Sequence, residues 1–116
     1  MIWLWLSAAF MVTTAGVHSV LGYRRLIVPL LRGEAGALAD PLTRRIIRFA
    51  WHATSVLMLI SAAAVAWPGT PHALLIAIGA GWLATGLFNA VYTKGQHIAW
   101  PALGGAGIFA LIGALT

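Results

Sequence analysis

Four apolar segments make up most of this 116-residue chain, and six of its seven Lys and Arg residues stand in the connection between the first two segments. Those six residues are Arg24, Arg25, Arg32, Arg44, Arg45 and Arg48. A helix needs about 20 consecutive apolar residues to cross a bilayer, and the segments have about that length. The pattern predicts an all-α polytopic membrane protein with four transmembrane helices in an antiparallel bundle.

The boundaries of the spans follow from apolar runs and from helix start and stop signals. We expect one domain over residues 1–116, with spans at about 2–23, 41–67, 73–92 and 98–115. Asp40 is a good helix cap and Pro41 suits the first turn, so the second span should begin there and end before Pro68. Residues 24–40 form the basic connection, whose apolar part should lie at the membrane interface or extend the first helix up to Pro29.

The composition supports a membrane protein and argues against a nucleic-acid-binding domain. Hydrophobic residues make up 61% of the chain and charged residues 8%, whereas a soluble domain averages about 25% charged residues. The net charge of +5 is gathered beside apolar segments, and no soluble domain is present to offer it to a nucleic acid. Because the chain has no cysteine, disulfides and thiolate metal sites are excluded.

The distribution of Lys and Arg predicts the orientation in the membrane. The first connection carries six arginines, the second carries no cation and the third carries Lys94. Cationic connections stay cytoplasmic, so we expect the first and third connections in the cytoplasm and both termini outside a bacterial-type inner membrane. Anionic lipid headgroups are the expected partners of four arginines near the inner surface: Arg24, Arg25, Arg44 and Arg45.

Small residues recur every four positions on the last two spans. The third span has this pattern at Ala77, Gly81 and Thr85, and the fourth has it at Ala102, Ala106, Ala110 and Ala114. Such faces let helix backbones approach closely in lipid. They predict helix packing within the chain or the seam of a homo-oligomer or larger membrane complex, and the spacing does not choose between these.

Polar side chains from three spans are expected at one level on the cytoplasmic side. His18, His52 and Asn89 each lie a few residues from a cation at the end of their span, which places them within about 9 Å of that boundary at the helical rise. Ser55 lies one turn beyond His52 on the same face, and Arg48 lies one turn before it. The expected ligand-binding site therefore comprises His18, Arg48, His52, Ser55 and Asn89.

This site suits a proton or a small anionic ligand. The roles we expect are proton acceptance or hydrogen bonding by His18 and His52, orientation by the amide of Asn89, and attraction of anions by Arg48. The corresponding function is that of a small transport, channel or complex-associated subunit. Catalytic residues are not expected, because no Asp, Glu or Cys lies inside a span to complete a catalytic set.

Two alternatives stay open at this point. Haem is a possible cofactor, with His18 and His52 as axial ligands of an electron-transfer module. Alternatively, the histidines hold the helices in register, and the protein is a purely structural partner subunit. A metal ion is not expected, since only two histidines qualify as ligands and nearby arginines would repel it.

Overall fold

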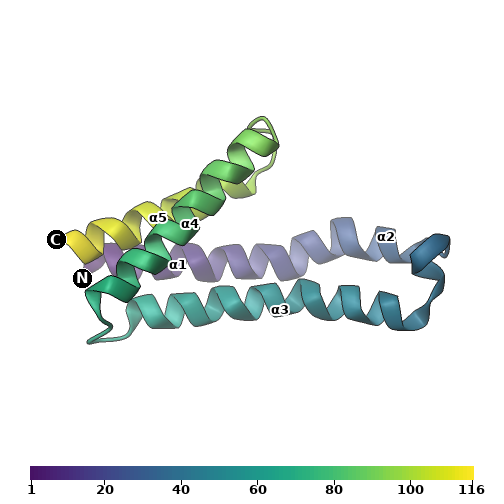
Figure 1. Ribbon diagram of the computed structural model, residues 1–116, viewed down its shortest axis with the longest axis horizontal. Coiled ribbons are helices and arrows are strands. Elements are labelled where there is room, and N and C mark those ends of the chain that lie inside the picture. Colours follow the sequence, from purple (N-terminus) through teal and green to yellow (C-terminus); the bar gives the residue numbers. More distant parts are fainter.

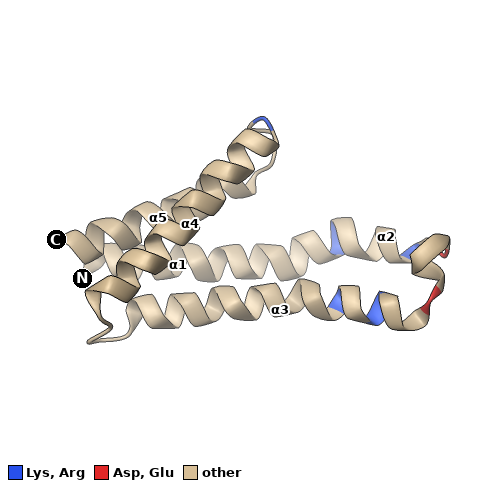
Figure 2. Ribbon diagram, viewed as in Figure 1, with Lys and Arg blue, Asp and Glu red and all other residues tan.

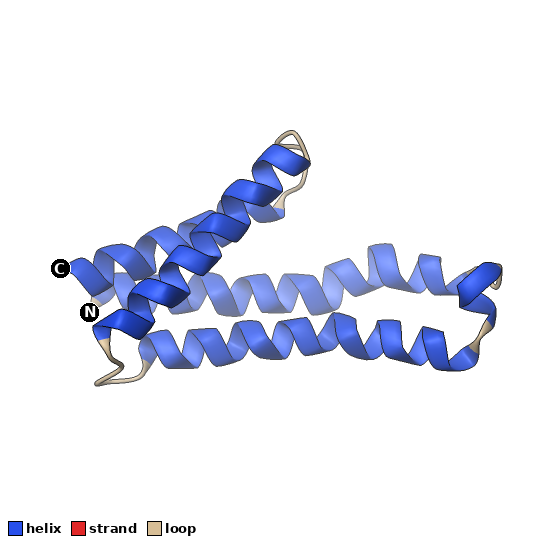
Figure 3. Cartoon of the chain, in the orientation of Figure 1, coloured by secondary structure: helices blue, strands red, loops and turns tan.

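The computed structural model describes residues 1–116 and is all-helical, with 85% of the chain in helix and no strand (Figure 3). The helical segments, in chain order, are α1 (Ile2–Val17), η1 (His18–Ile27), α2 (Val28–Arg32), η2 (Gly36–Ala39), α3 (Pro41–Ala66), α4 (His72–Tyr92) and α5 (Ala99–Leu115). The first three follow one another without a break and form a single rod of 31 residues (Figure 1).

These elements form two antiparallel hairpins. The first pairs the rod with α3, and the second pairs α4 with α5 (Figure 1). Helix α5 also packs along α1, so both termini lie at one end of the molecule (Figure 1). The second hairpin diverges from α3 as it runs toward its tip, which leaves α3 and α4 in contact mainly near the connection that joins them (Figure 1).

The helices have the length and surface of membrane helices. The rod, α3 and α4 are long and apolar enough to cross a bilayer, and α5 is a shorter apolar helix of 17 residues. Only 16 of the 116 residues are buried, whereas large side chains such as Phe49 and Phe88 are about 70% exposed. A surface this apolar is disfavoured in water, which indicates a membrane location.

Charge is confined to the parts of the molecule far from the termini. The arginines lie at the outer end of the first hairpin, and Lys94 lies at the tip of the second (Figure 2). Both carboxylates, those of Glu34 and Asp40, are in the same connection as the arginines (Figure 2). Along the long axis of the molecule, the Arg, Asp and Glu side chains therefore lie at the end opposite the termini.

The first helix is longer than the span expected from the sequence. We expected this span to end near Tyr23, but the helix continues past Pro29 to Arg32. Residues 18–27 have π-helical geometry, and the amide of Val28 donates to the carbonyl of Tyr23, five residues earlier. Pro29 follows directly on this π-helical stretch and lacks the N–H that would continue the ladder. The basic connection outside this helix begins only after Arg32.

Helix α3 begins at Asp40, as the sequence predicts. The Asp40 carboxylate accepts the backbone N–H groups of Leu42 and Thr43 over 3.3 and 3.2 Å, and the Thr43 hydroxyl donates to it over 2.9 Å. The hydroxyl of Thr43 and the amide of Leu42 hold the pKa of Asp40 below its ordinary value, because both bonds favour the ionised carboxylate.

Glycines bring α4 and α5 into backbone contact. A Cβ added at Gly107 would overlap the amide nitrogen of Leu83 and lie 2.6 Å from the carbonyl oxygen of Gly79. A Cβ at Gly86 would lie 2.5 Å from the amide nitrogen of Gly104. Backbones at this separation leave no room for a side chain, so the two helices pack as the small-residue rule for membrane helices requires.

Within the chain, the small-residue face expected on α5 is packed, and the one expected on α4 is not. Ala106, Ala110 and Ala114 are buried, with at most 4% of their surface exposed. On α4 the buried residues are Leu75, Gly79 and Gly86, whereas the expected face of Ala77, Gly81 and Thr85 is exposed. Small residues follow a four-residue spacing on more than one face of α4. The face that packs against α5 is the one whose glycines let the two backbones approach most closely.

Candidate functional site

His18 and Trp51 join the rod to α3 through two hydrogen bonds and a ring stack. His18 Nε2 lies 3.0 Å from the carbonyl oxygen of Trp51, and Trp51 Nε1 donates to the carbonyl oxygen of His18 over 2.8 Å. Their ring centroids are 3.9 Å apart, with 13° between the ring planes. Because a carbonyl oxygen can only accept, Nε2 carries the proton of a neutral His18.

Gly22 makes room for this stack. A Cβ at Gly22 would lie 2.8 Å from Cζ2 of Trp51, so the indole ring lies directly on the glycine. The glycine stands one helical turn after His18, which leaves the indole between the imidazole and the bare backbone. The space beside His18 is therefore filled by Trp51.

A second cluster lies one residue further along both helices. Ser19 Oγ is 3.0 Å from Nδ1 of His52, and the Ser19 hydroxyl donates to Ser55 Oγ over 2.6 Å. Since the Ser19 proton is directed to Ser55, the Ser19 oxygen accepts a proton from Nδ1 of His52. Neutral His52 is then left with an unshared electron pair on Nε2, which has no hydrogen-bond partner within the chain.

Tyr23 connects His52 to the charged end of the hairpin. The rings of Tyr23 and His52 are 4.7 Å apart and inclined at 48°, and Arg48 donates its Nε–H to the Tyr23 hydroxyl over 3.0 Å. Arg48 is exposed, whereas Tyr23 and His52 are half-buried. The predicted proximity of Arg48, His52 and Ser55 is thus present, with Ser19 and Tyr23 as the side chains between them.

An open, shallow surface region, here called the groove, runs along one face of α3 beside this cluster, and all seven residues that line it belong to α3. Its polar lining consists of Arg45, Arg48 and His52, and its apolar lining consists of Phe49, Ala53, Val56 and Leu57. The chain has only two carboxylates, and that of Asp40 is engaged as a helix cap. The groove therefore presents cationic groups without an anion to balance them.

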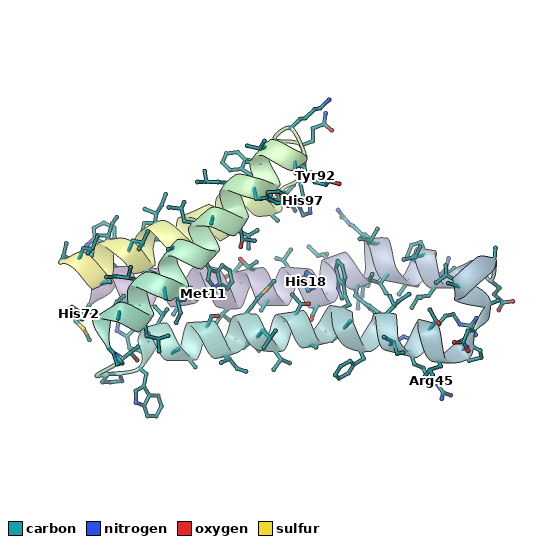
Figure 4. All side chains as sticks on the ribbon, in the orientation of Figure 1. Met11, His18, Arg45, His72, Tyr92 and His97 are labelled. Carbon is teal, nitrogen blue, oxygen red and sulfur yellow. The ribbon has the colours of Figure 1, made fainter.

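Asn89 does not join the histidines of the first hairpin, contrary to our expectation. Its Nδ2 lies 3.1 Å from Nδ1 of His97, so the two residues form a pair within the second hairpin. That hairpin diverges from α3 toward its tip, and His97 lies away from His18 (Figure 4). Equal depth in the membrane places side chains at one height along the rods, but it does not set the lateral distance between them.

The geometry does not offer His18 as a haem ligand. Its Nε2 is bound to the Trp51 carbonyl, and one face of its ring is covered by the indole. Ligation through Nε2 would require breaking both contacts. No three His, Cys, Asp or Glu side chains lie close enough together to hold a metal ion. His18 holds the two helices in register, and His52 is the histidine whose second nitrogen is unpaired.

Three residues of the site lay outside the expected set: Ser19, Tyr23 and Trp51. Ser19 and Tyr23 are four residues apart, so both lie on the face of the rod that meets α3. The sequence predicts a polar stripe of Arg48, His52 and Ser55 on α3 from their spacing of three and four residues. The same spacing rule, applied to the rod, gives the stripe of Ser19 and Tyr23 that meets it. The spacing alone did not show which of the two neighbouring stripes, through His18 or through Ser19, would meet it.

Comparisons with models of protein families, with curated proteins and with solved structures found no match. The function of the chain is therefore inferred from the His52 cluster and its groove.

Proposed function

We propose that this chain is a small inner-membrane protein that binds a proton and a small anionic ligand at the His52 groove, as a transporter, a channel or a subunit of a larger membrane complex. One observation carries the proposal. His52 is held through Nδ1 by Ser19, while the groove that it lines also contains Arg45 and Arg48.

The chemistry of this arrangement couples protons to anions. The unshared pair on Nε2 of neutral His52 can accept a proton. Protonation adds a third cationic group to the two guanidinium groups, and no carboxylate in the groove offsets them. An anion bound there favours the protonated imidazole, and the protonated imidazole favours the anion.

The orientation that we propose has four spans, both termini outside, and the charged end of the first hairpin in the cytoplasm. Helix α5, with 17 residues, is about 26 Å long at 1.5 Å per residue. This is a few ångströms less than the hydrocarbon thickness, a mismatch that a bilayer accommodates at modest cost. The excess of arginine in the first connection supports the assigned direction.

Cysteine labelling tests the orientation cleanly because the chain has no cysteine of its own. Ala35→Cys and Gln96→Cys should react with a membrane-impermeant maleimide only after cells are permeabilised. Pro68→Cys, in the connection between α3 and α4, should react in intact cells. Labelling of Ala35→Cys in intact cells would refute the proposed direction.

Histidine NMR tests the binding function. The full chain, with ¹⁵N-labelled histidine, is placed in phosphatidylcholine nanodiscs and titrated with inorganic phosphate. We expect the His52 signals to shift as phosphate is added. Arg48→Gln should weaken this response, while Arg24→Gln, an equal loss of charge on the rod, should leave it unchanged. A His52 spectrum that is indifferent to phosphate would refute the function.

Transport is tested separately in proteoliposomes that contain a pH-sensitive dye. A phosphate gradient should change the internal pH through the wild-type protein and through His72→Gln, whose side chain is exposed on another helix. His52→Gln should abolish the change. Binding without any flux would assign the chain to a subunit role within a larger complex.

A further inference from the structure

We propose that the anion held at this groove is the phosphate of a membrane lipid, and that one acyl chain of the lipid runs along α3 into the space between the two hairpins. The inference rests on the proposed function, because it uses the same arginines and the same histidine. It adds the chemical class of the ligand and the path of its apolar part.

The lining of the groove changes from cationic to apolar along the helix axis. Arg45 and Arg48 stand at the charged end, His52 lies one turn further in, and Val56 and Leu57 lie at the far end. The lining spans about 18 Å from the first to the last residue at the helical rise. A lipid has the same order of chemistry along the same direction, with phosphate at the membrane surface and hydrocarbon beneath it.

A second open cavity of about 220 Å³ lies next to the groove. Both are lined by Leu57, and the second also contacts Trp82 of α4 and Leu103 of α5. It therefore lies between α3 and the second hairpin, where the hairpins diverge (Figure 1). An acyl chain that follows α3 past Leu57 would reach this second cavity.

Two of the three hydroxyl groups around the second cavity, those of its threonines and not that of Ser61, donate to carbonyls of their own helices. Thr54 donates to the carbonyl of Ala50 over 3.0 Å, and Thr85 donates to the carbonyl of Gly81 over 2.7 Å. Such bonds leave these side chains presenting mainly their methyl groups. The cavity consequently offers hydrocarbon contact and little demand for a polar ligand.

The charges favour a phosphate on a lipid over a free anion. Guanidinium groups bind phosphate through paired N–H donors, and these two arginines have no carboxylate beside them in the groove. A free anion would balance the charge at Arg45 and Arg48, but it would leave the surface of Ala53, Val56 and Leu57 uncovered. Only a ligand with both a phosphate and a hydrocarbon chain uses the whole groove.

The test counts phosphatidylglycerol that stays bound to the full chain in native mass spectra after transfer from nanodiscs to detergent. The groove variants are Arg45→Gln with Arg48→Gln, which removes the charge, and Val56→Trp, which blocks the apolar end at an exposed position. The control is Arg32→Gln with Lys94→Gln, which removes equal charge at two exposed positions outside the groove. Phosphatidylcholine serves as the reference lipid.

We expect phosphatidylglycerol to be retained in preference to phosphatidylcholine, and retention to fall about tenfold in both groove variants but not in the control. Val56→Trp should keep the His52 response to inorganic phosphate, because its arginines are intact. Equal loss in the control would mean general attraction to charged lipid and would overturn the site. If His52 responds to phosphate but lipid retention is the same in every variant, the lipid proposal is overturned and the proposed anion-binding function stands. If His52 does not respond to phosphate and lipid retention does not change, both proposals are overturned.

Discussion

Trp51 donates its indole N–H to the carbonyl of His18, the residue at which the first rod changes from α-helix to π-helix. A side chain that takes a backbone carbonyl out of the helical ladder is a recognised cause of local widening. The returning bond from Nε2 of His18 to the Trp51 carbonyl fixes the register of α3 at the same level. One pair of residues thus joins the rod to α3 at the level where the rod changes from α-helix to π-helix.

Removal of the indole donor should destabilise the first hairpin. Trp51→Phe keeps an aromatic ring on His18 but loses the bond to the His18 carbonyl, and hydrogen bonds between membrane helices contribute about 0.6 kcal/mol on average and up to about 1.7. We expect a decrease of that size in the free energy of unfolding, measured by denaturant titration in lipid bicelles. Trp67→Phe, at a ring 71% exposed, is the control. Equal stability of the two variants would show that the bond contributes nothing.

Gly22→Ala should be destabilising, although alanine is the better helix former. The new Cβ would lie 2.8 Å from a ring that is held by a stack and a hydrogen bond, so the ring must move, at a cost of about 1–3 kcal/mol. At Gly16 a Cβ meets nothing within 4 Å, and Gly16→Ala should stabilise the helix by up to about 1 kcal/mol. Opposite signs are therefore expected in the same unfolding assay. A stabilising Gly22→Ala would mean that the indole does not lie on the glycine.

The sequence predicted the helices well because the physical signals for them are local. Apolar length gives the span of each helix, and the Asp40–Pro41 pair marks the start of α3 through side-chain bonds to the next residues. The continuation of the first helix past Pro29 to Arg32 was not predicted, because proline usually ends a helix. The π-helical stretch that precedes Pro29 has no local signal in the sequence.

Lateral arrangement was less predictable from the sequence. Asn89 has the depth expected of a partner for His18 and His52, but its helix packs against α5 through Gly79 and Gly86 and is carried away from α3. The rotation and tilt of a membrane helix depend on which small residues permit the closest backbone contact, and this choice is made between helices. Spacing within one helix shows which faces could make such a contact, but it does not show which face will make it.

Gly107→Ala should separate α4 from α5. The added methyl group would overlap the Leu83 amide and crowd the carbonyl of Gly79, and neither backbone group can turn aside. We expect a loss of about 3 kcal/mol or more in the free energy of unfolding, at the upper end of overpacking effects. Gly104→Ala, on the same helix with nothing within 4 Å of its new Cβ, should be tolerated. Similar losses in both variants would argue against backbone contact at Gly107.

The Asp40 cap should weaken in acid. The pKa of this carboxyl is lowered in the folded chain by the Thr43 hydroxyl and the Leu42 amide, so its stabilising effect is fully present above the ordinary value of about 3.9 and is lost as the pH falls through the lower, folded value. Amide exchange at Leu42 and Thr43 should accelerate below about pH 4 relative to amides in the middle of α3. Asp40→Asn keeps an acceptor that does not titrate, and its relative exchange should not change over this range. An identical pH dependence in the two proteins would exclude the carboxylate as the cause.

The hydrogen bonds of Ser19 make a specific prediction about the proton of His52. Because the Ser19 hydroxyl donates to Ser55, neutral His52 should carry its proton on Nδ1, where the Ser19 oxygen accepts it, and not on Nε2. Nitrogen chemical shifts of ¹⁵N-labelled histidine, recorded at a pH where the imidazole is neutral, distinguish these two forms. Ser19→Ala removes the acceptor and should shift the population toward the Nε2–H form. Ser7→Ala, which breaks a bond from Ser7 to the Ala106 carbonyl in another part of the bundle, should leave the His52 spectrum unchanged. A wild-type His52 protonated on Nε2 would reverse the assigned direction of these bonds and remove the proton acceptor from the groove.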